Sequence, residues 1–486
     1  MGLDKVPVKL LKLALPFISK PLTYIYNLCI SQNIFPSALK TARVIPLPKN
    51  KDLSDVNNFR PISILPLLSK PLEKHIQKHL LTFMENNNLF HSFQSGFRPN
   101  HSCSTALATL CDKWLSNINE SKLTGAVFLD FKKAFDLVDH SILLQKLKEY
   151  VRDDNTLAFF KSYLYKRQQT VSVNCYSSKI GIIEYGVPQG SILGPILFGI
   201  YINDLPLYIS NENVRCDLFA DDSTLHTSAD DISSIAKLLN TSLKEVSNWC
   251  QDNLMVIHPN KTKCMVVTTR QKRQLKKLTL NLSINSVPIE QVSEHKVLGV
   301  ILDEEMKWNN QINVISKKVS RTLFLMSKLK HFADQKSITM FHNAHVMPYI
   351  NYASVLWDGA KRVHLDIIKS LYRRSVRIIG KDYNMSTDDK LKMLNMLPFY
   401  KHLEYNKAVF MFKVFSESSP VNICALFDKC RSNRSMNFKP PKPRIDLFET
   451  SISCSGTKIW NSLPLNAKTS KTLISFKKIV YNHFMQ

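Results

Sequence analysis

Residues 126–136 read Ala-Val-Phe-Leu-Asp-Phe-Lys-Lys-Ala-Phe-Asp, and they place the carboxylate of Asp130 directly after four consecutive apolar residues. Such an uninterrupted apolar run is typical of a strand that is buried on both faces, so we expect a strand over 126–129. A carboxylate at the end of a buried strand is costly unless it is paired or binds a metal ion. This stretch therefore predicts a buried sheet with a polar site at the end of one strand.

A second stretch, Leu218-Phe219-Ala220-Asp221-Asp222, has the same character. Residues 218–219 and 224–227 flank the Asp pair as the two strands of a hairpin would. Taken alone, the pair suits a turn as well as catalysis. A similar Ala-Asp-Asp string at 229–231 precedes a helical pattern over 231–250, which Asp230 or Asp231 would cap. Three carboxylates at two strand ends suit two hard divalent cations about 4 Å apart.

The charge balance points to a polyanionic partner. The chain has 65 Lys and Arg against 39 Asp and Glu, a net charge of +26. An excess of this size favours nucleic acid through counterion release, although charge that serves solubility alone gives the same balance. The chain contains neither G-x-G-x-x-G nor G-x-x-x-x-G-K-[ST], which argues against Rossmann and P-loop enzymes.

Cysteine usage and hydropathy indicate the compartment. Ten cysteines occur without a C-x-x-C pair or a zinc-type spacing, as expected of reduced thiols in an intracellular protein. No apolar run reaches the roughly 18 residues of a membrane span. Lys9, Lys12 and Pro16 interrupt what would have to be the apolar core of a signal peptide. We therefore expect a protein of the nucleus and cytoplasm with no membrane contact.

Predicted strands and helices alternate over roughly residues 40–302, so we expect an α+β core there and a mostly helical region from residue 303 onward. The proline-rich stretch 438–445 reads as an extended linker. Further helices are expected over 5–31, 65–81, 141–150 and within 188–205, and further strands over 43–47, 169–173 and 180–185.

Seven motifs, in a fixed order along the chain, carry a resemblance to a known family. They are Ile45-Pro46-Leu47-Pro48-Lys49, Asn58-Phe59-Arg60-Pro61-Ile62-Ser63, Gln94-Ser95-Gly96-Phe97-Arg98, the stretch from Asp130 to Asp139-His140, Gly186-Val187-Pro188-Gln189-Gly190-Ser191 with its continuation to Leu205, Phe219-Ala220-Asp221-Asp222, and Asn260-Lys261-Thr262-Lys263 followed by Leu298-Gly299-Val300. The chain resembles the reverse transcriptases of non-LTR (LINE-type, jockey-like) retrotransposons, strongly over residues 1–302 and more loosely beyond. His258 departs from the pattern, because an Asn is common at that position.

The resemblance implies an α+β right-hand polymerase with a mainly helical C-terminal extension. It divides the chain into a helical lead-in over 1–40, fingers and palm over 41–302, thumb helices over 303–345 and a basic, mainly helical C-terminal region over 346–486. Complete proteins of this lineage carry an upstream endonuclease, so we expect the nicking activity to come from elsewhere and the chain to be a truncated copy or a partial product.

The resemblance also implies a role for each motif residue. Metal ligation and catalysis fall to Asp130 and Asp221, with Asp222 as a less direct partner. Lys261 is the motif lysine that protonates the pyrophosphate leaving group, although Lys263 is not excluded. The nucleotide-binding residues implied are Lys49, Arg60, Phe131, Phe135, Gln189 and Gly190. The position of Lys49 is equally typical of a solvated charge on a loop. The ring of Phe135 would lie under the deoxyribose and exclude a 2′-hydroxyl.

Basic helix faces and two further motifs are the expected contacts to primer and template. The set comprises Arg98, Leu298, Gly299, Lys317, Arg321, Lys369, Arg373 and Arg377. The last three recur at i, i+4 and i+8 on a predicted helix, a stripe that a merely solvated face produces as well.

The expected activity is extension of a DNA primer on an RNA template with dNTPs and two Mg²⁺ ions, or Mn²⁺ in their place. The alternative is a catalytically inactive, element-derived protein that binds nucleic acid, although all three carboxylates are intact. An RNA-templated RNA polymerase is disfavoured, because such an enzyme would prefer a small or polar residue to Phe135. The sequence leaves template, target site and oligomeric state open.

Overall fold

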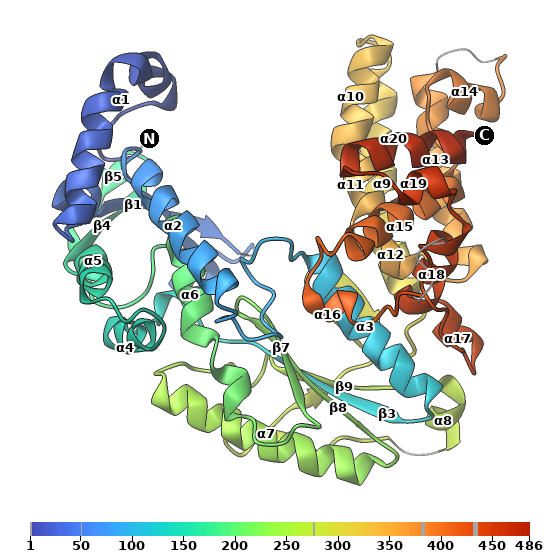
Figure 1. Ribbon diagram of the computed structural model, residues 1–486, viewed down its shortest axis with the longest axis horizontal. Coiled ribbons are helices and arrows are strands. Elements are labelled where there is room, and N and C mark those ends of the chain that lie inside the picture. The colour runs from blue at the N-terminus through green and yellow to red at the C-terminus, as the bar shows by residue number, and fades with distance from the viewer. Residues whose placement is uncertain (1, 50, 276–277, 381–383, 431–435) are drawn as a thin grey trace.

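The computed structural model describes residues 2–49, 51–275, 278–380, 384–430 and 436–486. Two arms rise from a sheet at the base, an N-terminal arm and a largely helical C-terminal arm (Figure 1). The expected α+β class with a mainly helical C-terminal region is confirmed. Within these described ranges, no helix combines the length and the apolar character that crossing a bilayer requires.

The base is a five-stranded sheet of order β12-β9-β3-β8-β7. The strands span Leu123–Leu129 (β3), Arg215–Phe219 (β7), Asp222–Ala229 (β8), Lys263–Val267 (β9) and Glu290–Gln291 (β12). All seven residues of β3 are buried, as the apolar run at 126–129 predicts. Strands β7 and β8 form the predicted hairpin, in which Phe219 pairs with Asp222.

Strand β3 is buried on both faces because each face carries its own core. Ala126 and Phe128 belong to a core shared with α3 (Cys103–Asn119) and the C-terminal arm. Val127 and Leu129 belong to a second core, shared with helices of the N-terminal arm and with α7 (Ile232–Asp252). Successive side chains of a strand point to opposite faces, so a continuous apolar run is what a two-sided core requires.

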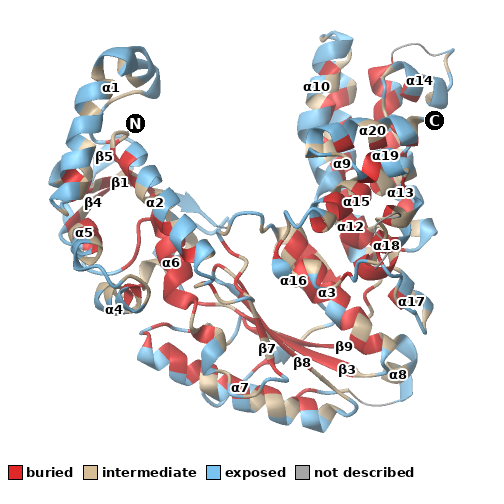
Figure 2. Ribbon diagram, viewed as in Figure 1, coloured by how far each residue is buried: buried red, intermediate tan, exposed pale blue. Residues whose placement is uncertain are grey.

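The N-terminal arm is a second sheet surrounded by helices. Its order is β2-β1-β4-β5, and β6 also pairs with β4. The strands are Thr41–Pro48 (β1), Phe59–Ile64 (β2), Arg167–Val173 (β4), Tyr176–Ser177 (β5) and Gly181–Ile183 (β6). The helices are Val8–Ser31 (α1), Ser69–Asn86 (α2), His140–Tyr150 (α4), Asp154–Leu164 (α5) and Gly194–Ile202 (α6). Helix α1 projects from the arm and is largely exposed (Figure 2), whereas α6 is buried almost throughout.

The C-terminal arm begins with a small hairpin and continues as packed helices. The hairpin is Glu294–Val297 (β13) with Val300–Asp303 (β14). Short elements before it are Arg270–Leu275 (α8), Ser283–Ile284 (β10) and Val287–Pro288 (β11). The helices after it are Asn309–Leu329 (α9), Gln335–His345 (α10), Met347–Asn351 (α11), Ser354–Trp357 (α12), Arg362–Ile379 (α13), Thr387–Met393 (α14), Phe399–Phe415 (α15), Val421–Cys424 (α16), Asp446–Glu449 (α17), Ile452–Ser462 (α18), Leu465–Lys468 (α19) and Leu473–Met485 (α20). One core runs through α9, α10 and these later helices.

Two expectations about local structure need refinement. Asp231, rather than Asp230, caps α7, because its side chain accepts a hydrogen bond from Ser234 N. The stretch 438–445 contains no regular helix or strand, but a free extended linker is wrong at its start. Phe438 is only 1% exposed and packs against Trp460 with ring centroids 6.0 Å apart.

Candidate active site

The structure brings Asp130 and Asp221 to one cleft between the base sheet and the N-terminal arm. Asp130 directly follows β3, and Asp221 lies in the tight turn between the neighbouring strands β7 and β8. The turn is possible because Ala220 adopts a left-handed conformation with φ 58°. The cleft encloses about 1060 Å³. Two carboxylates that are 91 positions apart in the sequence therefore face the same solvent-filled space.

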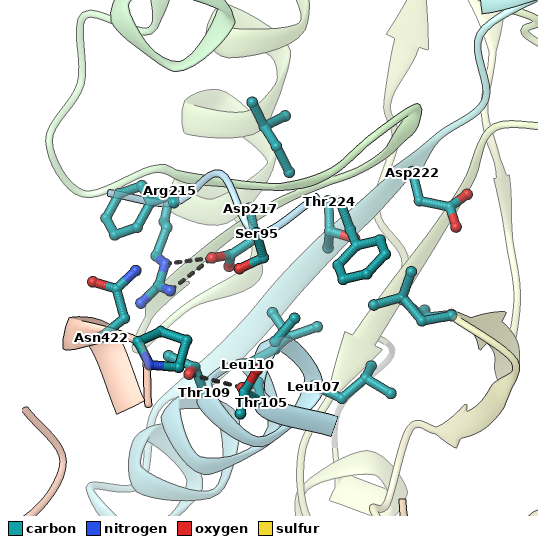
Figure 3. Close-up of a pocket in the computed structure, with 17 residues that line it drawn as sticks. Ser95, Thr105, Leu107, Thr109, Leu110, Arg215, Asp217, Asp222, Thr224 and Asn422 are labelled. Atoms are coloured by element: carbon teal, nitrogen blue, oxygen red, sulfur yellow. Dashed lines mark hydrogen bonds and ion pairs between the residues drawn. The ribbon is translucent and has the colours of Figure 1, made fainter. Parts of the chain in front are cut away.

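Asp222 takes a different direction from its neighbour. It lines a small pocket of about 30 Å³ on the other side of the hairpin, together with Phe219 and Leu298. In Figure 3, Asp222 lies at the end of that pocket opposite Arg215. The role of Asp222 as a less direct partner of the site remains a prediction.

The electrostatics of the turn suit a cation. Loss of hydration raises the pKa of Asp221, and repulsion from Asp130 adds to the shift. Loss of hydration, followed by repulsion from Asp221 and Asp130, raises the pKa of Asp222 to about 6. Burial is the larger cause of both shifts, and the smaller contribution from repulsion reflects carboxylates that lie close together. Carboxylate oxygens are the ligands that hard divalent cations prefer, so the donor set fits such an ion chemically.

The carboxylates at the β7–β8 turn are not part of a compact cluster of metal ligands. Among the described residues, no three His, Cys, Asp or Glu side chains converge closely enough to chelate a metal. Metal binding by Asp130 and Asp221 remains a prediction.

A loop after α7 fixes the backbone on both sides of Asp130. His258 N donates to Asp130 O at 2.7 Å, and Lys132 N donates to Val256 O at 2.8 Å. The hydroxyl of Thr262 accepts from Asp130 N at 3.3 Å. The departure at His258 leaves this loop intact, because the histidine uses its backbone for the contact.

The same loop decides between the two candidate lysines. Lys261 lines the cleft, and its Nζ lies 3.9 Å from Asp130 Oδ2. Lys263 lies in β9, where its Nζ forms an ion pair with Glu290 at 2.5 Å and donates to Asn260 O at 2.7 Å. Lys261 is therefore the lysine that faces the carboxylates.

The segment 93–96 supports the turn from the outside. Ser95 N donates to Leu218 O at 2.8 Å, and Leu218 N donates to Phe93 O at 2.9 Å. Gly96 packs directly on the turn, since a Cβ at this position would lie 2.3 Å from Ala220 N. The glycine of this motif is thus required by a close backbone approach.

Two cations of the N-terminal arm face the carboxylates across the cleft. Lys49 follows β1 and Arg60 lies in β2, and both line the cleft. Lys49 Nζ also donates to Asn57 O at 3.2 Å. The charge of Arg60 lowers the pKa of Asp221 and so opposes the larger effect of desolvation. A cleft with carboxylates on one wall and cations on the other suits a polyphosphate bridged by cations.

Phe135 and Phe131 both line the cleft, but their rings differ in exposure. Phe135 stacks on Phe198 with centroids 4.3 Å apart, and it remains partly accessible. Phe131 is 6% exposed and meets the edge of Trp249 at 6.3 Å. The Phe131 ring is part of the core, although the residue lines the cleft, and its contact with the nucleotide remains a prediction.

Gln189 and Gly190 are held against β2. Ser63 N donates to Gln189 O at 2.8 Å, and Gln189 Nε2 donates to Asp136 Oδ1 at 2.9 Å. Gly190 has φ 137°, and a Cβ there would lie 2.2 Å from Ser63 O. The close approach that Gly190 permits is therefore made to the strand of the N-terminal arm.

Leu298 and Gly299 form the turn of the β13–β14 hairpin, with φ 46° and 84°. Leu298 O accepts a hydrogen bond from the hydroxyl of Tyr352 at 2.5 Å. Leu298 also lines the small pocket that Asp222 borders, so this hairpin lies next to the carboxylate turn.

Arg98 is held by an internal partner, and two cations of the α13 stripe lie beside carboxylates at the surface. Arg98 forms two hydrogen bonds to Glu85, at 2.9 and 2.8 Å, and its side chain is 13% exposed. Arg373 pairs with Asp388 at 2.9 Å, and Lys369 lies 3.5 Å from Asp366. We assign a structural role to Arg98. Lys369 and Arg373 are each 39% exposed beside their partners, and their contact with nucleic acid remains a prediction.

The other predicted nucleic-acid contacts stay open to solvent. Lys317 and Arg321 are exposed on α9, and Arg377 is exposed on α13. Their contact with nucleic acid remains a prediction.

Sequence reasoning missed a charged cluster on the strands β7 and β8, of which Figure 3 shows the pair Arg215 and Asp217. Asp217 accepts from Arg215 at 2.6 and 2.9 Å and pairs with His226 at 2.8 Å. Burial alone would raise the pKa of Asp217, but His226 and Arg215 lower it below the usual value. The guanidinium of Arg215 also lies 4.1 Å from the ring centroid of Phe93. Alternation along β7 places these side chains together, yet nothing in the local sequence marks them as partners.

Comparison with known protein families identifies the family to which the chain belongs. Residues 47–302 match the family described as reverse transcriptase (RNA-dependent DNA polymerase). The chain belongs to the reverse transcriptase family. The division of the chain into a helical lead-in over 1–40, fingers and palm over 41–302, thumb helices over 303–345 and a C-terminal region over 346–486 remains a prediction.

Relatives extend the similarity beyond the matched region. The chain is 31% identical over 383 residues to "RNA-directed DNA polymerase from mobile element jockey" of Drosophila funebris, which covers 76% of this chain and 41% of that protein. It is 24% identical over 440 residues to "Probable RNA-directed DNA polymerase from transposon X-element" of Drosophila melanogaster, which covers 87% of this chain and 47% of that protein. The chain thus spans less than half the length of these relatives.

Among solved structures, a telomerase from Candida tropicalis in complex with a TWJ fragment of telomeric RNA is similar at a TM-score of 0.41. Sequence identity is 10%, and the similarity covers 79% of this chain and 65% of that chain.

Proposed function

We propose that this reverse transcriptase extends a DNA primer on an RNA template, as the polymerase of a jockey-like non-LTR retrotransposon. The observation that carries the proposal is the cleft, where Asp130 and Asp221 face Lys49 and Arg60. A DNA polymerase needs this combination, because its substrate is a polyanion that reacts at one phosphorus atom. The RNA template, the DNA primer and the dNTPs are the partners in this proposal, and the nucleus and cytoplasm are its sites of action.

Each residue of the cleft has a role that follows from its position. Asp130 and Asp221 would hold two divalent ions, Mg²⁺ or Mn²⁺, and Asp222 would add negative charge beside them. Such ions supply charge neutralisation of the triphosphate and activation of the primer 3′-hydroxyl. Arg60 suits phosphate oxygens through its fork of donors, and Lys49 suits them as a point charge.

Lys261 and Phe135 act on the two ends of the nucleotide. Lys261 lies beside Asp130 and can donate a proton to the pyrophosphate oxygen as the bond to phosphorus breaks. Phe135 is braced by Phe198, so its ring cannot move aside for a ribose 2′-hydroxyl without disturbing the core. The cleft therefore favours dNTPs over ribonucleotides.

Primer extension with an RNA template, an annealed DNA primer, dNTPs and Mg²⁺ tests the proposal. Asp221→Asn should lower the rate by at least about 10²–10³-fold, because it removes a charge that is preorganised for the transition state. Asp230→Asn is a matched control, since Asp230 lies in the other Ala-Asp-Asp string and is exposed outside the cleft. It should extend primers at the wild-type rate.

Two results would contradict the proposal. Near-normal extension by Asp221→Asn would show that the site is elsewhere. No extension by the wild type, with RNA binding that weakens steeply as salt rises, would favour the inactive nucleic-acid-binding protein instead.

A further inference from the structure

A proline-rich segment runs from the C-terminal arm to the end of α3. Residues 439–444 read Lys-Pro-Pro-Lys-Pro-Arg. At the first end of the segment, Lys439 N donates a hydrogen bond to Asp428 O at 2.7 Å. At the second end, Arg444 N donates to Asn119 Oδ1 at 2.7 Å. The segment is therefore anchored at both ends, although it forms no helix or strand between them.

The prolines determine the backbone conformation between the two anchors. A proline ring fixes its own φ near −65°, and it also drives the preceding residue away from the helical region. Pro440, Pro441 and Pro443 are restricted in this way, and so are Lys439 and Lys442, which each precede a proline. These restrictions favour a polyproline II helix, which has three residues per turn and needs no internal hydrogen bonds.

Three residues per turn divide the segment into three edges. Pro440 and Pro443 share the first edge, and Lys439 and Lys442 share the second. All four of these residues are exposed, whereas Pro441, which lies on the third edge, is half-buried. The segment thus rests on the protein by its third edge, and it presents one edge of prolines and one edge of lysines to solvent.

The two exposed edges define the chemistry of a partner. Proline rings that recur every third residue fit a groove lined by aromatic side chains, which is the way SH3 domains bind their ligands. The ammonium groups beside the rings require carboxylates along the same groove. Because both ends of the segment are already anchored, association costs little further ordering of the backbone. An SH3-type groove bordered by acidic residues meets these requirements.

We propose that residues 439–444 form a docking strap for a partner protein that has an aromatic-lined, acidic groove of the SH3 type. No described residue of the cleft that holds Asp130 and Asp221 belongs to this strap. The proposal therefore goes beyond the proposed function, and binding through the strap does not depend on polymerase activity.

The test measures binding of the full chain to a panel of purified SH3 domains that differ in the number of carboxylates beside the groove. The chain is immobilised for biolayer interferometry, and each domain is titrated up to about 1 mM so that a weak contact is still detected. We expect saturable binding that is tightest for the most acidic domain. Binding to that domain should weaken as salt rises, because the lysine edge contributes through charge.

Substitutions on each edge of the strap give the matched comparison. Pro440→Ala and Pro443→Ala should each weaken binding by about tenfold, because each removes one ring from the groove. Lys442→Glu should weaken binding to the most acidic domain and have less effect on the least acidic one. Pro441→Ala is the control, since its ring lies on the edge that faces the protein, and it should bind within about threefold of the wild type. Unchanged urea unfolding midpoints would show that these variants fold normally.

Three results would overturn the proposal. The first is the absence of saturable binding by every domain of the panel. The second is binding that survives Pro440→Ala and Pro443→Ala, which would show that the domains contact another surface. The third is a loss of RNA affinity in Lys442→Glu while the wild type binds no SH3 domain, which would make the strap a contact for nucleic acid instead.

Discussion

The substitution Gly96→Ala tests whether the carboxylate turn is held in place by backbone packing. An added Cβ would lie 2.3 Å from Ala220 N and 3.0 Å from Ala220 Cα, whereas ordinary contacts of this kind are 3.4 Å or longer. Gly96 and Ala220 are both buried, and the atoms that clash belong to the backbone. No side-chain rotation can relieve this overlap, so the turn must move by about 1 Å.

A displacement of this size has a calculable consequence. Ala220 precedes Asp221, so the movement transfers directly to the carboxylate in the cleft. A misplacement of about 1 Å in a catalytic group costs roughly 10²-fold in rate. Overpacking of a buried site also lowers the free energy of unfolding by about 1–3 kcal/mol. We expect kcat for primer extension to fall about 10²-fold, with a smaller effect on KM for the dNTP because Lys49 and Arg60 do not move with the turn.

The assay is single-nucleotide primer extension at saturating dNTP, with urea unfolding of the same preparations. Gly199→Ala is the matched control, because a Cβ at Gly199 in α6 meets no atom within 4 Å. Alanine is also the better helix former, so this variant should be active and slightly more stable. If Gly96→Ala remains folded and extends primers within about threefold of the wild-type rate, the packing argument is refuted.

Three further predictions concern other parts of the chain. In the metal-free protein, Asp222 has its pKa raised to about 6, so the native state binds more protons than the unfolded state between about pH 4 and 6. Its contribution therefore makes the free energy of unfolding fall as pH rises through this window, and urea titrations of Asp222→Asn should lack that component. Lys407→Ala should lower the free energy of unfolding by about 3–5 kcal/mol, measured by urea unfolding. The reason is that the Asp358 carboxylate, which lies 2.7 Å from Lys407 Nζ and is 10% exposed, loses its partner. Replacing both Lys407 and Asp358 by Ala should cause a smaller loss. Phe135→Ala should raise incorporation of ribonucleotides relative to dNTPs by about tenfold or more, measured as a ratio of kcat/KM values, and an unchanged ratio would exclude the ring as the selecting group.

Features that depend on a few consecutive residues could be predicted from the sequence. The run Ala126 to Leu129 is a buried strand because four adjacent apolar side chains need cover on both faces. The hairpin around Asp221 follows from two short β-prone runs with a tight turn between them. Asp231 caps α7 through its own side chain, and this contact spans only three residues. In each case the groups that interact are neighbours in the chain.

The partners of charged side chains could not be predicted in the same way. The stripe at Lys369, Arg373 and Arg377 has the spacing of a nucleic-acid contact, but Asp388 lies on α14 and takes the charge of Arg373. Arg98 lies in one of the seven motifs, yet Glu85 at the end of α2 binds it. A sequence pattern reports which charges share a helix face, whereas a salt bridge depends on which other element lies opposite that face.

The sequence by itself determined the family, the α+β core with its helical extension, and the two strand ends that carry Asp130 and Asp221. These follow from local order: apolar runs, turns and motifs whose residues lie within a few positions of each other. Only the tertiary structure decided which side chains share the cleft. In this structure Lys261 lies beside Asp130, whereas Lys263 pairs with Glu290, and the Phe131 ring is buried. Asp136 accepts a hydrogen bond from Gln189, which lies 53 positions away in the sequence. The physical reason is that a hydrogen bond or an ion pair acts over about 3–4 Å, and distances that short between remote residues exist only once the sheet and its helices have packed.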